Sequence, residues 1–131
     1  MGTYLRDRYG DALRVVGFAT SNGSFNALSQ PDPTLLMGGA MTTHVLPPPL
    51  TDAYEAALAQ MGLARALVDL RSASSSAAGQ WLVDPHPFRL IGALYADAYP
   101  EYLWYVTRLT ESFDGLCYLR DTTPSTLLPF P

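Results

Sequence analysis

Residues 14–20 read RVVGFAT, a near-continuous apolar run with the length and composition of a strand buried on both faces. Three similar runs follow at residues 65–70, 88–94 and 115–120. Helical or loop segments separate the four runs, which is the arrangement of an α/β protein. We therefore predict an α/β fold with a mostly parallel sheet of about four strands, covering helices and long loops.

Two segments around these runs have helical signals. Residues 3–9 keep helical spacing of apolar side chains until Gly10 supplies a C-terminal cap. A second helix is predicted after the three prolines at 47–49, because Asp52 and Glu55 have the spacing of a capping box. The first helix begins almost at residue one, as expected of a chain cut from a longer polypeptide, although a short native helix would look the same.

The remaining segments are predicted to be mostly irregular. Residues 27–50 form a long loop with a short strand at 42–46, because prolines and glycines interrupt any periodicity. A second loop is predicted over residues 72–79, and the prolines that follow Trp81 argue against a helix there. Between residues 99 and 113 the pattern fits helix and extended chain equally.

Composition excludes several classes of function. The 131 residues are predicted to form a single α/β unit, residues 1–131, with a formal charge of −4 and no basic run that could neutralise a nucleic-acid backbone. All eight basic residues are arginines, so Schiff-base chemistry and a phosphate-binding P-loop lysine are excluded within this chain. No segment resembles a membrane span or a signal peptide, so we expect a cytoplasmic location.

The single cysteine, Cys117, lies in an apolar run and is expected to act as a small buried hydrophobe. One cysteine allows neither an intramolecular disulfide nor a zinc site built on cysteines. Neither histidine has a partner at a metal-ligand spacing. We therefore expect no metal and no cofactor.

Polar side chains follow three of the predicted strands, where α/β sheets bind their ligands. Ser24 lies in a polar segment after the first run, and Arg71 and Arg120 lie at the ends of two others. If the strands are parallel, these ends converge, and the two guanidinium groups become candidates for binding an acidic substrate group. Arg–Asp ion pairs that join strand ends explain the arginines equally well. Ser24 lacks a nucleophile elbow and is predicted to be a turn serine.

No residue of the chain is predicted to be catalytic. His44 and His86 each lie near prolines in predicted loops, and we expect neither to have a chemical task. Asp52 and Glu55 are explained by capping a helix N-terminus, where carboxylates complement the unpaired N–H groups.

Ten short strings give the chain a family resemblance. They are, in order, MGTYLRDRYG at residues 1–10, VGF at 16–18, GSF at 23–25, LPP at 46–48, YE at 54–55, LVDLR at 67–71, WL at 81–82, RLIG at 89–92, FDGL at 113–116 and YLRDTTP at 118–124. Their order and spacing resemble the C-terminal region of the erythromycin esterase family.

The resemblance implies a hydrolase lineage whose members open macrolide lactones and so confer antibiotic resistance, with relatives labelled as succinoglycan-synthesis proteins. In that family a histidine assisted by a glutamate activates water, and the motifs that carry both groups precede the region matched here. The resemblance thus implies a C-terminal fragment that supplies sheet strands and one wall of the substrate cleft, with Ser24, Arg71 and Arg120 as the candidate substrate-binding residues of that wall. The exposed edge of its incomplete sheet can self-associate. The alternative is a stand-alone binding or assembly module that kept the scaffold and lost catalysis.

Overall fold

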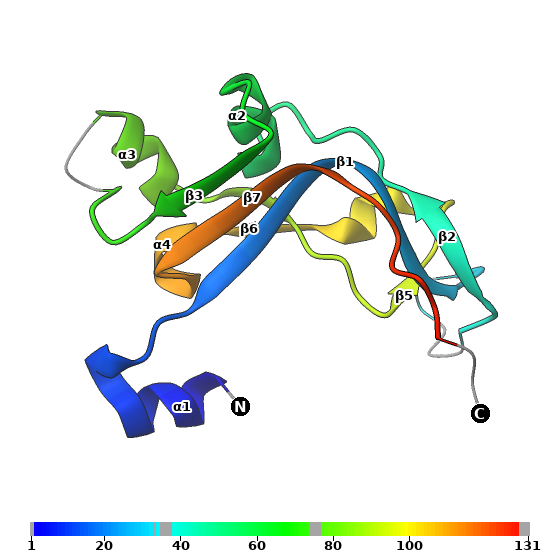
Figure 1. The fold of residues 1–131 in the computed structure, drawn as a ribbon, viewed down its shortest axis with the longest axis horizontal. Coiled ribbons are helices and arrows are strands. Elements are labelled where there is room, and N and C mark those ends of the chain that lie inside the picture. The colour runs from blue at the N-terminus through cyan, green and yellow to red at the C-terminus, as the bar shows by residue number, and fades with distance from the viewer. Residues whose placement is uncertain (1, 33, 35–37, 74–76, 129–131) are drawn as a thin grey trace.

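A computed structural model describes residues 2–32, 34, 38–73 and 77–128 of the chain. The main sheet has five strands, β1 (Val16–Ser29), β2 (Met41–Val45), β3 (Arg65–Asp69), β5 (Leu94–Tyr95) and β7 (Gly115–Thr122). The strand order is β2-β1-β7-β3, and β5 also pairs with β1 (Figure 1). A separate two-stranded antiparallel sheet consists of β4 (His86–Arg89) and β6 (Trp104–Thr107).

The α/β class is confirmed, but the prediction of a mostly parallel sheet is wrong. Strand β1 runs parallel to β7 and β5, whereas β2 is antiparallel to β1 and β3 is antiparallel to β7. An apolar run indicates a strand with apolar side chains on both faces, and this pattern is the same for either direction of the chain. Strand direction is set by the segments that connect one strand to the next, and the apolar pattern within a strand carries no information about them.

Strand β1 is longer than its apolar run, because it continues through the polar segment that was predicted to be a loop. Its first part pairs with β7 from Val16 to Gly23, and its second part pairs with β2 from Ser24 to Leu28. Gly23 has a φ of 112°, which only glycine adopts easily, at the point where the pairing partner changes. Ser24 is therefore a strand residue and not a turn serine.

The helices are short. They are α1 (Gly2–Tyr9), α2 (Tyr54–Gln60), α3 (Ala77–Val83), α4 (Leu109–Ser112) and the 3₁₀ segments η1 (Gly10–Ala12) and η3 (Pro100–Leu103). Helices α1 and α2 lie where the sequence predicted them, and α1 buries no side chain and stands away from the sheet (Figure 1). None of the helices in the described ranges is long and apolar enough to span a membrane.

Three local predictions are wrong. Helix α3 contains Trp81 and ends at Val83, so the prolines that were expected to prevent a helix lie beyond its end. Residues 74–76 of the predicted loop lie outside the described residues. The apolar run at residues 88–94 is divided, since β4 ends at Arg89 and β5 begins at Leu94. The predicted capping box is also absent, because Ala53 is the N-cap of α2 and makes no side-chain cap hydrogen bond.

The two faces of the main sheet differ in their packing. On one face Ala19 and Tyr118 are paired in register and buried against Tyr54 of α2. On the other face Phe18 and Leu67 flank Cys117 in one row across β1, β7 and β3, and they are 69% and 76% exposed. The core thus lies under one side of the sheet, and a row of apolar side chains on the other side is open to solvent.

Candidate functional site

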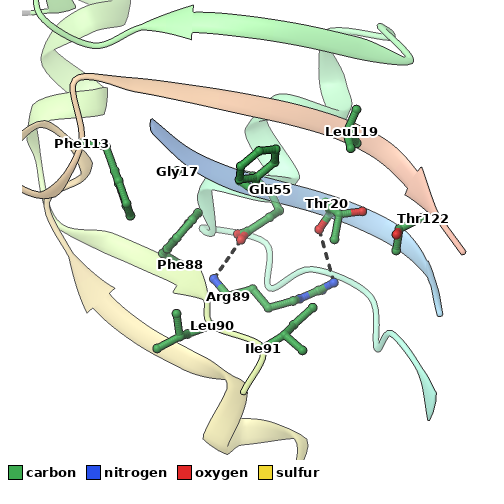
Figure 2. Close-up of a pocket in the computed structure, with 12 residues that line it drawn as sticks. Gly17, Thr20, Glu55, Phe88, Arg89, Leu90, Ile91, Phe113, Leu119 and Thr122 are labelled. Atoms are coloured by element: carbon green, nitrogen blue, oxygen red, sulfur yellow. Dashed lines mark hydrogen bonds between the residues drawn. The ribbon is translucent and has the colours of Figure 1, made fainter. Parts of the chain in front are cut away.

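A pocket of about 400 Å³ opens between the first half of β1, the end of β7 and the segment that follows β4 (Figure 2). Its walls are largely apolar, with side chains of Phe88, Leu90, Ile91 and Phe113. Two ionisable residues, Glu55 and Arg89, also line it. A pocket with apolar walls and a few convergent polar groups is the usual form of a small-molecule site.

Glu55 is the second residue of α2 and is fully buried. Its Oε1 atom accepts a hydrogen bond of 2.8 Å from the backbone N–H of Arg89 (Figure 2). Its Oε2 atom is buried and has no hydrogen-bond partner among the described residues. Burial raises the pKa of Glu55, and the Arg89 hydrogen bond and charge oppose this only in part. The site therefore contains a carboxyl group that favours its protonated form more than an exposed glutamate does.

Arg89 ends β4 and is also buried. Its Nη2 atom donates to the Pro47 carbonyl at 2.7 Å. Its Nη1 atom lies 3.4 Å from the Thr20 carbonyl oxygen (Figure 2). The guanidinium carbon lies 4.8 Å from the centroid of the Trp104 ring, within the range of a cation–π contact. Burial lowers the pKa of Arg89, and the nearby charge of Glu55 opposes that shift. These contacts hold the guanidinium group at the pocket.

The pocket combines a buried carboxyl group with a fixed cation and an apolar wall. A protonated carboxyl group can donate a hydrogen bond to a carbonyl oxygen, and a guanidinium group can stabilise negative charge on such an oxygen. The apolar walls suit the hydrocarbon part of the same molecule. This arrangement fits an uncharged ester or lactone better than a highly charged substrate.

The three residues predicted to bind substrate do not all meet. Ser24 follows Gly23, which pairs with Thr122 near the end of β7, so Ser24 and Arg120 lie toward the same end of the β1–β7 pair. Arg71 follows the end of β3, which is antiparallel to β7 and pairs there with Gly115. Arg71 therefore lies at the opposite end of β7, and the predicted convergence of three strand ends is wrong.

Both arginines form ion pairs with an aspartate nearby in the chain. Arg71 Nη2 lies 2.6 Å from Asp69 Oδ2, and Arg120 Nε lies 3.0 Å from Asp121 Oδ2. All four side chains are exposed. The substrate-binding roles of Ser24, Arg71 and Arg120 stay predictions.

Arg71→Ala is expected to raise the pKa of Asp69 from about 2 toward 3.8, because the Arg71 hydrogen bonds and charge hold that pKa down. The melting temperature should stay unchanged at pH 7, since exposed ion pairs contribute little stability. An NMR titration of the Asp69 carboxyl carbon measures the pKa. Arg120→Ala is the control and should leave Asp69 unaffected, and an unchanged Asp69 pKa in Arg71→Ala would contradict the pairing.

The two ionisable residues of this pocket were not predicted from the sequence to form a site. Glu55 was assigned to a helix cap, because its spacing from Asp52 fits that role. Arg89 could have been found, since it is the one charged residue in the apolar run at residues 88–94, and a charge inside such a run usually has buried partners.

Both histidines also have more contacts than predicted. His44 lies on β2 and is hydrogen-bonded to Asp97, with 3.0 Å between His44 Nδ1 and Asp97 Oδ2. His86 lies on β4, and its ring stacks on Trp81 with 4.1 Å between centroids. Neither is a loop histidine. Within the described ranges, no group of three or more His, Cys, Asp or Glu side chains is placed to hold a metal ion.

The chain is similar in fold to parts of two solved structures. None of the curated proteins matches the chain. A solved structure of a succinoglycan biosynthesis protein is 23% identical, with a TM-score of 0.76 over 93% of this chain and 27% of its own. A solved structure of a Bacillus cereus protein is 20% identical, with a TM-score of 0.78 over 95% of this chain and 28% of its own. The chain thus has the fold of a little more than a quarter of each of these proteins.

The sequence model of the erythromycin esterase family matches residues 1–122. The match covers nearly the whole chain, including every residue that lines the pocket. The chain therefore belongs to the erythromycin esterase family.

Proposed function

We propose that this chain is the C-terminal part of an erythromycin esterase-like hydrolase, in which it supplies sheet strands and one wall of the substrate cleft. In this proposal the chain is catalytically incomplete for that hydrolysis when it is alone. The observation that carries it is the apolar row of Phe18, Cys117 and Leu67 on the open face of the sheet, in which Phe18 and Leu67 are exposed and Cys117 is partly buried. Exposed apolar rows in the middle of a sheet mark a surface that other polypeptide covers.

The lengths of the related structures support this proposal. The chain spans 27% and 28% of the two solved proteins that share its fold. In an α/β domain both faces of the central sheet are covered. The remaining polypeptide of such a protein is long enough to cover the open face beside β1, β7 and β3.

The pocket supports the part of the proposal that concerns the cleft. Glu55 and Arg89 present a carboxyl group and a cation beside apolar walls, which suits the carbonyl and hydrocarbon parts of a lactone. In the larger protein, Ser24 and Arg120 extend this wall at one end of β7, and Arg71 contributes at the other end. The catalytic proton acceptor for hydrolysis is proposed to come from the remaining polypeptide.

The isolated chain is expected not to hydrolyse macrolides, because general-base catalysis needs a proton acceptor within reach of the attacking water. Purified chain is incubated with erythromycin, and mass spectrometry follows the mass gain of one water that accompanies lactone opening. A longer family protein serves as the positive control. Turnover by the chain alone that disappears in a His44 or His86 variant would overturn the proposal.

The exposed apolar row gives a second prediction, that the isolated chain self-associates. Phe18→Lys combined with Leu67→Lys should convert the associated chain into a monomer, because like charges replace the apolar contact. Size-exclusion chromatography with light scattering measures the mass. The control is Val45→Lys with Val106→Lys, which adds the same charge at similarly exposed residues elsewhere.

The pattern of association separates the two candidate functions. A cut domain should give a broad distribution of species, whereas a stand-alone assembly module should give one defined oligomer. A monomeric wild-type chain would count against both.

A further inference from the structure

A second cluster of polar side chains lies around His44, away from the Glu55 pocket. The His44 side chain is only 3% exposed. Its ring packs between Phe25 and Tyr95, with centroid separations of 5.6 Å and 4.9 Å. These contacts fix the orientation of the imidazole and hence the direction of both its nitrogens.

One nitrogen of His44 faces a carboxylate. The Nδ1 atom lies 3.1 Å and 3.0 Å from the two oxygens of Asp97, whose side chain is 70% exposed. An ionised carboxylate only accepts hydrogen bonds, so Nδ1 carries the proton in this pair. In neutral His44 the other nitrogen, Nε2, is then an acceptor.

The acceptor nitrogen faces two hydroxyl groups. His44 Nε2 lies 2.9 Å from Thr42 Oγ1 and 3.5 Å from Ser29 Oγ, and the two hydroxyl oxygens are 2.5 Å apart. Thr42 and His44 are two residues apart on β2, so their side chains project from the same face of the strand. Thr42 is exposed, whereas the ring that it contacts is buried. An exposed hydroxyl thus hydrogen-bonds to a histidine that a carboxylate orients.

We propose that Thr42, His44 and Asp97 form a nucleophilic relay that accepts the acyl group of small activated carboxylic esters. Thr42 Oγ1 attacks the ester carbonyl carbon, and His44 Nε2 takes the hydroxyl proton. The C–O bond to the leaving group breaks with its electron pair, which gives an acylated Thr42 and an alkoxide or phenoxide that takes up a proton. Asp97 holds the Nδ1 proton and stabilises the imidazolium formed during the step.

This inference goes beyond the proposed function, because it concerns a reaction of the isolated chain at different residues. None of Ser29, Thr42, His44 and Asp97 lines the Glu55 pocket. The relay requires no residue from other polypeptide. Its test is therefore independent of whether a longer protein hydrolyses macrolides.

The test uses the complete chain and p-nitrophenyl acetate, whose phenolate leaving group departs without a proton donor. We expect release of p-nitrophenolate in a burst of one equivalent, together with an acetyl group on the peptide that contains Thr42. Thr42→Val should abolish the acetylation, and Thr42→Ser should retain it. His44→Gln should slow the reaction by about 100-fold or more, the usual contribution of a positioned general base.

Thr43→Val is the matched control. Thr43 is the neighbouring exposed threonine on the other face of β2, and its hydroxyl donates to Asn26 Oδ1 at 2.8 Å. This variant should be acetylated at the wild-type rate. Circular dichroism and the melting temperature establish that each variant is folded.

Three outcomes would overturn the relay. They are an unchanged rate in folded Thr42→Val, an acetyl group on Ser29 or another residue in place of Thr42, and an unchanged rate in folded His44→Gln. If His44→Gln does not fold, the comparison of Thr42→Val with Thr42→Ser and Thr43→Val decides the question, because Thr42 is an exposed residue and its substitution should leave the fold intact.

Discussion

Glu55→Ala is expected to lower the free energy of unfolding by about 3 kcal/mol at pH 7. The substitution removes the acceptor of the buried Arg89 N–H, and an unsatisfied buried donor costs about 1–3 kcal/mol. It also removes the carboxylate that opposes the desolvation of the buried Arg89 guanidinium, and it leaves a cavity at the pocket. Urea denaturation followed by circular dichroism measures the change. A loss below about 1 kcal/mol would show that Glu55 does not hold β4 against α2.

Glu55→Gln separates the charge from the hydrogen bond, because its side-chain oxygen can still accept from Arg89. In the folded protein burial raises the pKa of Glu55 above its ordinary value of 4.5. Between 4.5 and the raised value, the folded state binds more protons than the unfolded state, so stability falls as the pH rises. Wild type should therefore lose stability relative to Glu55→Gln across that window and show a constant difference below it. A difference that is the same at all pH values would contradict the raised pKa.

Gly23→Ala is expected to lower the free energy of unfolding by about 3 kcal/mol. The φ of Gly23 is 112°, where side chains are strained, and an added Cβ would overlap the carbonyl group of Thr122 on β7. Relieving the overlap requires β1 and β7 to separate at the register pair that joins them. Chemical denaturation measures the loss, and hydrogen exchange of the β7 amides locates it.

Gly62→Ala is the control for backbone strain alone. Gly62 has a φ of 70°, but an added Cβ would meet no atom within 4 Å. This variant should lose about 1 kcal/mol, so the excess loss in Gly23→Ala measures the collision with Thr122. Equal losses in the two variants would contradict the close approach of β1 and β7.

Several elements could be predicted because their signals are local in the chain. The apolar runs at residues 14–20, 65–70 and 115–120 correspond to β1, β3 and β7, although one face of these strands is open to solvent in the structure and was predicted to be buried. Helix α2 follows the prolines at residues 47–49 and ends before Gly62, as its flanking residues require. The order of short strings along the chain also indicated the family.

The candidate sites could not be predicted in this way, because their residues are far apart in the sequence. Glu55 and Arg89 are separated by a helix and a strand, and His44 meets Asp97 across the end of the main sheet. The sequence around each of these residues can be explained by a purely structural role, as the spacing of Asp52 and Glu55 was explained by a helix cap. Only the packing of α2 against β4, and the pairing of β2 and β5 with β1, brings the partners together.

The sequence by itself determined the α/β class, the main strands, the first two helices and the family, because composition and spacing along the chain specify burial and helix ends. The tertiary structure decided the strand directions, the open apolar face, the Glu55–Arg89 pocket and the His44 relay. The physical reason is that pairing direction and hydrogen-bond partners depend on how distant segments approach one another. That approach is set by the whole packed chain and is not contained in any one segment.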